Sequence, residues 1–232
     1  MPGRYTITAE SKNISERFSV EVPDTYQKRY NAAPTQSLPV ISTSQLKRLS
    51  YYYWGLIPQW SKNKALATKL FNARADSLKD KISFKNSLKS RRCIIPVDGY
   101  YEWKSVSKKS KIPYRIVLQS GELFSLAGLW ESYEDDTGNE VFTFTIITTE
   151  ANSEVAKIHD RMPIILNQET ESMWLDLKEE EDEILKLLKP YPSHLMSSYA
   201  VSSKVNEVAN DSPELIEPAP PADQFGNYSL FD

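Results

Sequence analysis

Four short clusters hold the residues best suited to chemistry. The first is Asn72-Ala73-Arg74-Ala75-Asp76, in which an amide and a guanidinium are two residues apart and point the same way if the segment is extended. Arg74 would suit a phosphate, because a guanidinium donates paired hydrogen bonds to its oxygens. The competing interpretation is a solvated helix cap. The spacing therefore indicates that Arg74 is a candidate contact for an anion, and it does not decide between this role and a helix cap.

The second cluster, Pro96-Val97-Asp98-Gly99-Tyr100-Tyr101-Glu102-Trp103, places a carboxylate in an apolar, aromatic stretch. Burial raises the pKa of a carboxyl group, which would suit Glu102 for proton transfer. Trp103 offers a flat face on which a base or sugar can stack. The alternative is an ordinary glutamate on an edge strand.

The third cluster is Ile158-His159-Asp160-Arg161-Met162-Pro163. His159 is a candidate acid or base because histidine titrates near neutral pH, although a lone histidine also serves structural roles. The fourth cluster is the start of the chain, where Gly3-Arg4-Tyr5 follows Pro2. Arg4 is either a ligand contact or a solvated terminal charge.

The chain lacks the residues and motifs that several classes of binding and catalytic site require. Two histidines and one cysteine, Cys93, are too few for the usual zinc ligand sets, so we expect no metal. Only 7 glycines occur and they are never closely repeated, so no phosphate-binding or dinucleotide-binding glycine pattern exists. A Gly-x-Ser-x-Gly motif is also missing. We therefore expect no cofactor.

Many short strands and a few helices are expected to position these clusters. Alternation and apolar runs predict strands near residues 1–10, 38–41, 49–56, 93–97, 99–103, 114–118, 123–130, 141–148 and 162–166. Helices are expected within 11–30, over most of 61–90, at 151–158 and at 168–189. This pattern predicts one α+β domain, a β-rich bent sheet or open barrel with a few flanking helices, over residues 1–210. Residues 211–232 are expected to form an irregular acidic, proline-rich tail.

Composition places the chain among soluble globular proteins. Of its 232 residues, 40% are hydrophobic and 25% are charged. No apolar run approaches the roughly 20 residues that a membrane helix needs, and the first residues lack a signal-peptide core. A single cysteine excludes an internal disulfide. We therefore expect a cytoplasmic protein without a membrane partner.

Charge is divided unequally along the chain. Residues 1–120 hold 22 Lys and Arg against 8 Asp and Glu, a net charge of +14. Residues 121–232 hold 6 against 23, a net charge of −17. A basic half indicates a polyanion partner, because each neutralised phosphate releases counterions. The alternative is that the two halves attract each other within the fold.

Taken together, the clusters identify a protein family far more specifically than any one of them does alone. They occur in a fixed order with two further motifs: Gly3-Arg4-Tyr5, Asn31-Ala32-Ala33-Pro34-Thr35, Trp54-Gly55-Leu56-Ile57-Pro58, Asn72-Ala73-Arg74-Ala75-Asp76, the stretch Pro96 to Trp103, and His159-Asp160-Arg161-Met162-Pro163. This series resembles the SOS response-associated peptidase (SRAP) family, the abasic-site processing proteins. The resemblance extends from residue 2 to about residue 210.

The resemblance implies a groove for single-stranded DNA and a chemistry centred on the second residue. In that family the initiator methionine is removed, and a cysteine then closes a thiazolidine with the aldehyde of the abasic site, a stable DNA–protein crosslink. Carried over by motif, Asn72 would orient the N-terminal residue, Glu102 would be the acid or base, and His159 would assist opening of the sugar. The residues expected to contact DNA are Arg4, Arg74 and Arg161 on phosphates, and Trp60 and Trp103 against flanking bases.

The sequence departs from the family at the decisive position, because Pro2 replaces the catalytic cysteine. The chain is thus an altered or natural variant of a competent family. The resemblance implies an abasic-site sensor, with lyase and self-processing peptidase activity as further expectations. In the Pro2 form the stable crosslink would be defective. The alternative is a non-catalytic module that binds single-stranded DNA. The expected partner is single-stranded DNA with abasic sites, bound by a monomer that associates with the nucleoid.

Overall fold

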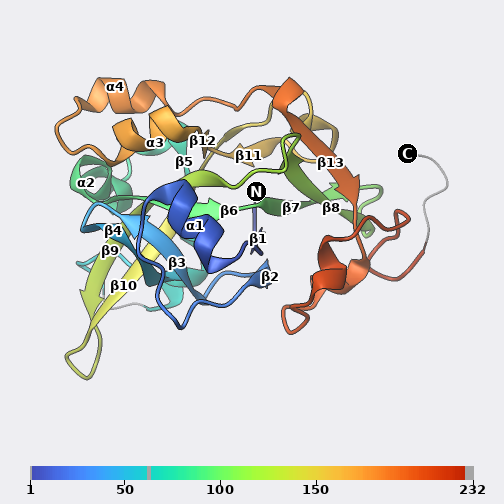
Figure 1. Cartoon of the computed structure of the whole chain (residues 1–232), viewed down its shortest axis with the longest axis horizontal. Coiled ribbons are helices and arrows are strands. Elements are labelled where there is room, and N and C mark those ends of the chain that lie inside the picture. Colours follow the sequence, from blue (N-terminus) through green and yellow to red (C-terminus); the bar gives the residue numbers. More distant parts are fainter. Residues whose placement is uncertain (1, 62–63, 228–232) are drawn as a thin grey trace.

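Five strands form a closed barrel at the centre of the computed structural model, which describes residues 2–61 and 64–227 (Figure 1). These strands are β3 (Ser37–Ser42), β4 (Gln45–Trp54), β6 (Arg92–Val97), β9 (Phe124–Glu134) and β10 (Glu140–Glu150). The ring closes because β10 pairs with β9 on one side and with β4 on the other. The prediction of a single α+β domain is confirmed. The barrel, which the sequence left as a bent sheet or an open barrel, is closed in the structure.

A second, five-stranded sheet packs beside the barrel. Its order is β13 (Met196–Ala200), β8 (Lys111–Leu118), β7 (Gly99–Ser105), β1 (Arg4–Ile7) and β2 (Arg29–Ala32). Only Asp98 separates β6 from β7, so the chain passes from the barrel into the second sheet at this residue. The aromatic side chains of Tyr5 and Trp54, 5.2 Å apart between ring centroids, join the two sheets in one core. The two sheets are thus held by shared packing as well as by chain continuity.

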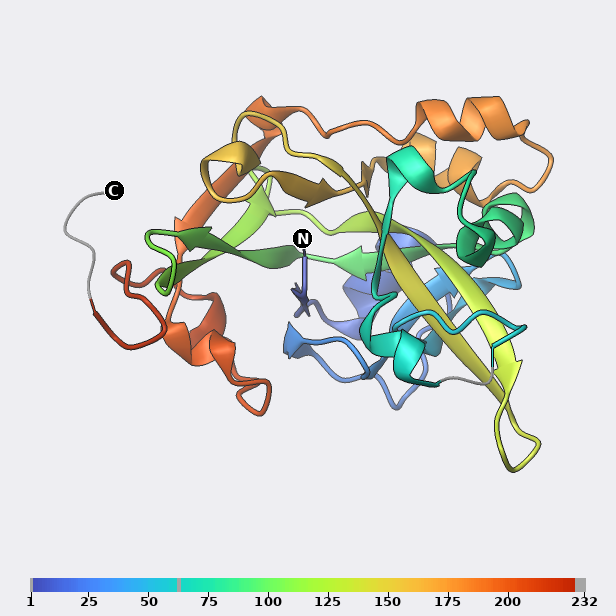
Figure 2. The same ribbon diagram turned by 180° about the vertical axis from the view of Figure 1, so that it is seen from behind.

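Three short strands extend the barrel sheet. They are β5 (Asn72–Arg74), β11 (Arg161–Pro163) and β12 (Ile165–Leu166), of which β5 and β11 both pair with β10. The expectation that residues 61–90 are mostly helical is therefore wrong for β5. The pairing with β10 is non-local, so helix-compatible residues take an extended form there. Figure 2 shows the teal segment that contains β5 in front of the barrel.

Four α-helices cover the outside of the sheets: α1 (Ser11–Phe18), α2 (Ile82–Ser90), α3 (Gln168–Leu175) and α4 (Glu181–Lys186). The helix expected over residues 168–189 is thus two shorter helices. Trp174 of α3 is fully buried and donates its indole N–H to the carbonyl of Cys93, 2.9 Å away. None of the helices in the described ranges is long and apolar enough to cross a membrane.

The C-terminal segment runs back over the second sheet. It holds 3-10 turns at Ser203–Asn206 and Pro213–Ile216, and Leu215 is buried in a small apolar cluster with Tyr101. The Asp211 carboxylate accepts the backbone N–H of Asn31, 2.9 Å away. Residues 211–227 therefore contribute contacts to the folded sheet.

Candidate active site

Strand β1 places the start of the chain against β7. Arg4 lies opposite Tyr101 and Tyr5 opposite Tyr100 in an antiparallel register. Continuing that register carries the residues before Arg4 toward Glu102. Pro2 itself is buried. The sheet thus brings two predicted site residues, Pro2 and Glu102, into one neighbourhood although they are far apart in sequence.

Asn72 is the direct link to the start of the chain. Its side-chain amide nitrogen donates to the carbonyl oxygen of Pro2, 2.7 Å away. Strand β5 holds Asn72 in register with Ile146 of β10. The Asn72 Oδ1 atom is buried and has no hydrogen-bond partner within the described part of the chain. Asn72 therefore restrains the Pro2 peptide group and keeps one acceptor free of hydrogen bonds within the described residues.

Glu102 is the buried carboxyl group of this site. It lies on β7 with 2% of its surface exposed. Burial raises the pKa of Glu102 from 4.5 to about 7, and the negative charge of Asp160 adds a smaller effect in the same direction. A carboxyl group with this pKa can take up or release a proton at neutral pH.

His159 is held in one tautomer by the backbone. Its Nδ1 atom accepts the N–H of Arg161 at 3.0 Å, and it also lies 2.8 Å from an Asp160 oxygen, a contact that would need a proton on Nδ1. We assign Nδ1 as the acceptor, because a backbone N–H can only donate and the Asp160 side chain is 86% exposed. Burial lowers the pKa of His159. The ring is then neutral at pH 7 and carries its proton on Nε2.

Two arginines flank the end of β10, joined through one carboxylate. The Arg74 Nη2 atom lies 2.7 Å from Asp76 Oδ2, and the Arg161 Nη1 atom lies 3.7 Å from the same oxygen. Arg161 is nearly buried and also donates to the Thr148 carbonyl at 2.7 Å, whereas Arg74 is 55% exposed. The structure therefore brings Arg74, Arg161 and His159 to one edge of the barrel sheet.

Arg4 is the first residue of β1, two residues after Pro2. It is partly buried, and burial lowers the pKa of its guanidinium. Its Nη1 atom donates to the Gly3 carbonyl at 2.8 Å. The Arg4 Nε atom is buried without a hydrogen-bond partner among the described residues. A cation in this state favours an incoming anion, because part of its water has already been removed.

The two predicted tryptophans lie apart from these groups. Trp103 follows Glu102 on β7, so its side chain is on the other face of the strand, where its indole N–H donates to Asn206 Oδ1 at 2.8 Å. Trp60 is 62% exposed and lines a shallow pocket with Ile82 and Arg91, whose lining includes no other predicted site residue. The structure does not bring either indole ring to the face of Glu102.

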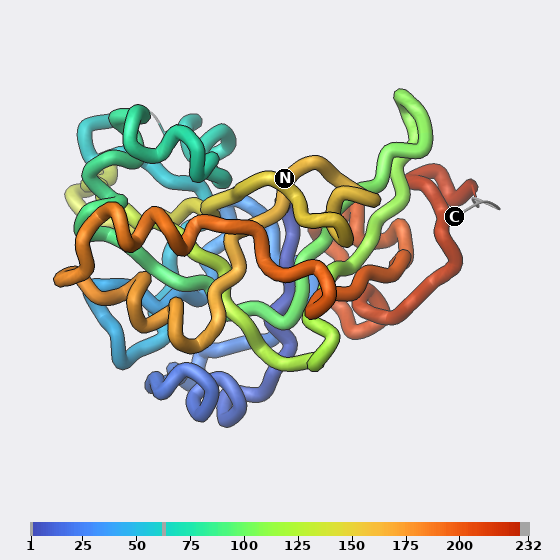
Figure 3. The backbone as a smooth tube through the Cα atoms, turned by 90° about the horizontal axis from the view of Figure 1, so that it is seen from above, coloured from blue at the N-terminus to red at the C-terminus, as the bar shows by residue number. Residues whose placement is uncertain are grey.

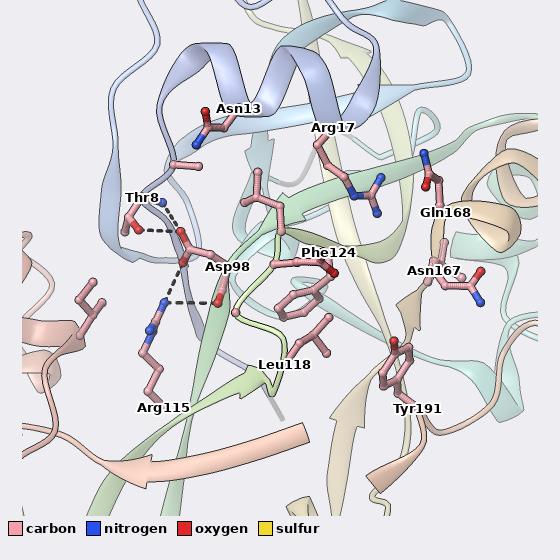
Figure 4. Close-up of a pocket in the computed structure, with 16 residues that line it drawn as sticks. Thr8, Asn13, Arg17, Asp98, Arg115, Leu118, Phe124, Asn167, Gln168 and Tyr191 are labelled. Atoms are coloured by element: carbon pink, nitrogen blue, oxygen red, sulfur yellow. Dashed lines mark hydrogen bonds and ion pairs between the residues drawn. The ribbon is translucent and has the colours of Figure 1, made fainter. Parts of the chain in front are cut away.

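A separate cavity of about 720 Å³ lies between α1, α3 and the corner at Asp98. None of the predicted site residues lines it. Asp98 accepts hydrogen bonds from Thr8 Oγ1 at 2.7 Å and from Arg115 Nη2 at 2.9 Å, as Figure 4 shows. Sequence reasoning assigned no role to Asp98 or Arg115. The four-residue spacing between Asp98 and Glu102 was the available signal, but it does not reveal that Asp98 forms an ion pair with Arg115.

Cys93 does not belong to the site. The thiol is fully buried on β6, and burial raises its pKa, so the reactive thiolate is disfavoured. Within residues 2–61 and 64–227, no group of three or more His, Cys, Asp or Glu side chains is arranged to hold a metal.

Comparisons with known proteins identify the family of this chain. The sequence profile described as "SOS response associated peptidase (SRAP)" matches residues 1–208. "Abasic site processing protein YoqW" of Bacillus subtilis is 46% identical over 222 residues, covering 94% of this chain and 99% of the relative. "Abasic site processing protein HMCES" of Gallus gallus is 33% identical over 227 residues, covering 83% of this chain and 67% of the relative.

A solved structure shares the fold. A crystal structure of a protein from Bacteroides thetaiotaomicron aligns with a TM-score of 0.84 and 31% identity, covering 93% of this chain and 99% of that one. The motif order, the contact between Asn72 and Pro2, and the profile match over residues 1–208 all lead to one assignment. The chain belongs to the SOS response associated peptidase (SRAP) family.

Proposed function

We propose that this protein processes abasic sites in single-stranded DNA through its second residue. The observation that carries the proposal is the hydrogen bond from Asn72 to the Pro2 carbonyl, beside the buried carboxyl group of Glu102. That bond restricts rotation of the Pro2 peptide group and so positions the proline nitrogen. The relatives named abasic site processing proteins support the choice of lesion.

The DNA strand would be held by the arginines around the site. Arg4 carries a partly desolvated charge, and Arg74 and Arg161 meet at Asp76. Phosphate contacts of this kind position a strand without reading its sequence. Trp60 and Trp103 remain candidates for stacking on flanking bases. Affinity should fall steeply as salt rises, because binding releases counterions.

The second residue determines what the reaction can produce. Removal of Met1 would turn the Pro2 nitrogen into a free secondary amine. Its lone pair attacks C1′ of the ring-opened aldehyde, and the amine proton passes to the carbonyl oxygen. The resulting hydroxyl takes up a second proton from solvent and leaves as water, and the nitrogen lone pair forms the C=N bond of the iminium. A thiazolidine cannot close, because proline has no thiol. The Pro2 form would therefore make a transient crosslink and no heat-stable one.

Strand cleavage follows from the iminium. The positive charge acidifies the C2′ proton, which a carboxylate of Glu102 can remove. The electron pair forms the new double bond, and the 3′ phosphate leaves with the electrons of its C–O bond. His159, with its proton on Nε2, would donate to the sugar oxygen during ring opening. Hydrolysis of the remaining iminium then releases the protein.

A borohydride trap tests this mechanism. The protein is first analysed by mass spectrometry for loss of Met1, then mixed with single-stranded DNA holding one abasic site, with and without borohydride. We expect a covalent band only with the reductant, plus a nicked strand. A processed protein that gives no trapped band would contradict the proposal, as would a heat-stable band without reductant. Pro2→Cys should restore the stable adduct.

The same assay separates the alternatives. If Met1 is retained, the Pro2 nitrogen is an amide that cannot attack, and native-gel retention without a trapped band would identify a binding module. A thiol peptidase is disfavoured, because Pro2 has no thiol and Cys93 is buried.

A further inference from the structure

The hairpin that joins β7 to β8 carries an unneutralised positive charge. Its exposed Lys108, Lys109 and Lys111 form no ion pair with a carboxylate in the part of the chain that the structure describes. Some exposed lysines elsewhere are neutralised by a neighbouring carboxylate, as Lys186 is by Glu183 and Lys204 by Glu214. The hairpin differs in that three unneutralised lysines lie within four residues of one another. In Figure 3 the green tip of this hairpin projects beyond the rest of the molecule. It is thus available to a large anionic partner.

This hairpin is continuous with the strand that carries Glu102 in the candidate active site. Strand β7 carries Glu102 and continues to Ser105, which pairs with Lys111 across the hairpin. The charge of Lys111 also contributes to lowering the pKa of His159, so the base of the hairpin lies within electrostatic range of that ring. An anionic strand that leaves the site on this side would run along the hairpin.

The C-terminal segment braces the hairpin without neutralising it. Ser110 Oγ donates to Asp223 Oδ2 at 2.6 Å, and the Lys111 backbone N–H donates to Gln224 Oε1 at 2.8 Å. The Gln224 side-chain amide donates in turn to the Lys109 carbonyl. All three bonds use backbone or hydroxyl groups, and they leave the ammonium groups to solvent. A braced arm loses less conformational entropy when it binds.

We propose that the β7–β8 hairpin is an arm that binds the phosphate backbone of the DNA strand beside the lesion, through Lys108, Lys109 and Lys111. This inference rests on the proposed function. Lysine suits the task, since a point charge recognises phosphates without regard to sequence. Strand β7 ends at Ser105 and the bend at the hairpin tip follows it, so Lys108 and Lys109 lie beyond the end of the strand that carries Glu102. The arm should therefore act only on strands that extend beyond the lesion on one side.

DNA probes with flanks of different length test whether the hairpin binds the strand beside the lesion. The probes are single strands with one unreactive tetrahydrofuran abasic analogue, flanked on the 5′ or the 3′ side by either two or ten nucleotides. We compare the parent protein with a Lys108→Ala, Lys109→Ala, Lys111→Ala variant. The matched control is Lys47→Ala, Lys178→Ala, Lys189→Ala, which removes three exposed lysines, one in β4 and one just beyond each of α3 and α4.

The arm variant should lose about tenfold or more in affinity for long flanks on one side only. Its slope of log affinity against log salt should fall by about 2, since each phosphate contact on a single strand contributes about 0.7. The control should change affinity less than twofold. A variant with Asp223→Ala and Gln224→Ala should weaken long-flank binding and keep the parent salt slope, because the charges remain.

An unchanged salt slope in the arm variant, or an equal loss for short and long flanks, would overturn the proposal. Failure of the proposed reaction is a separate result. If borohydride traps nothing while the flank effect is present, the arm is supported and the reaction is not. If trapping occurs without a flank effect, only the arm is excluded.

Discussion

Asp98 and Glu102 are four residues apart and both largely buried, yet their surroundings differ. The Asp98 side chain is 13% exposed and receives hydrogen bonds from Thr8 and from Arg115, whose guanidinium is buried beside it. Glu102 is 2% exposed, and burial is the largest effect on it, raising its pKa to about 7. A buried carboxylate that is fully paired holds structure, whereas one with a raised pKa is suited to proton transfer.

The same contrast separates two arginines. Arg115 pairs with Asp98 at 2.9 Å and so holds the corner where β6 becomes β7. Arg4 is partly buried, and no carboxylate within residues 2–61 and 64–227 forms an ion pair with it. The corner thus satisfies its charges internally, while the site at the start of the chain leaves charge for a ligand.

Glu102→Gln should give the largest effect. The amide keeps the shape of the side chain but cannot take a proton, so we expect the nicked strand to form about 10²- to 10⁴-fold more slowly, while borohydride still traps the iminium. Binding to a tetrahydrofuran probe should stay within twofold of the parent. If strand cleavage is unchanged, Glu102 is not the base, and its raised pKa does not distinguish its role from that of Asp98.

Asp98→Asn should act on stability instead. Removing one partner of a buried pair leaves Arg115 uncompensated, which costs about 3 kcal/mol of unfolding free energy. For a chain of this size the melting temperature should fall by roughly 6–12 °C. Trapping per folded molecule should be retained below the new transition. A loss of trapping at unchanged melting temperature would reverse the two roles.

A double variant sharpens this result. Asp98→Asn combined with Arg115→Met removes both charges of the corner pair. We expect it to be more stable than Asp98→Asn alone, because no buried charge is left without its partner. Strictly additive losses in urea unfolding would contradict the pairing.

The pH dependence of stability and of activity should identify Glu102 as the titrating group. Its pKa in the folded protein, about 7, lies above the ordinary value of 4.5, so the folded state keeps a proton that the unfolded state has lost. The unfolding free energy should therefore fall by up to about 3 kcal/mol as the pH rises from about 4.5 through about 7. Strand cleavage should rise over the upper part of this range, as the carboxylate forms. Glu102→Gln should remove both effects, and a parent protein with the same pH profiles as this variant would refute the assignment.

Asp76→Asn should give the smallest effect, since Asp76 and Arg74 are both largely exposed. Exposed pairs contribute little to stability, so the melting temperature should hardly change. The carboxylate competes with phosphate for Arg74 and Arg161, and its loss should raise affinity for single-stranded DNA severalfold. Arg74→Ala serves as the opposite control and should lower affinity for all sequences alike. Weaker binding by Asp76→Asn would show that the carboxylate is needed to orient the arginines.

The sequence by itself determined the local elements and the residue types of the candidate site. Residues 93–97 are a fully buried strand because they are continuously apolar, and the periodic apolar residues after 168 do form helices. The ordered motifs identified the family and pointed to Asn72, Glu102 and His159. These features depend on neighbours along the chain, which a single sequence displays directly.

Only the tertiary structure decided which groups meet. Asn72 reaches the Pro2 carbonyl because β5 pairs with β10, and Trp103 turns away from Glu102 because side chains alternate along β7. Asp98, four residues before Glu102, forms an ion pair with Arg115 because Arg115 comes from the neighbouring strand. Strand pairing joins residues far apart in sequence, and a one-residue shift in register would exchange the faces. No local pattern encodes that register, so the division of roles between two similar carboxyl groups appears only in the fold.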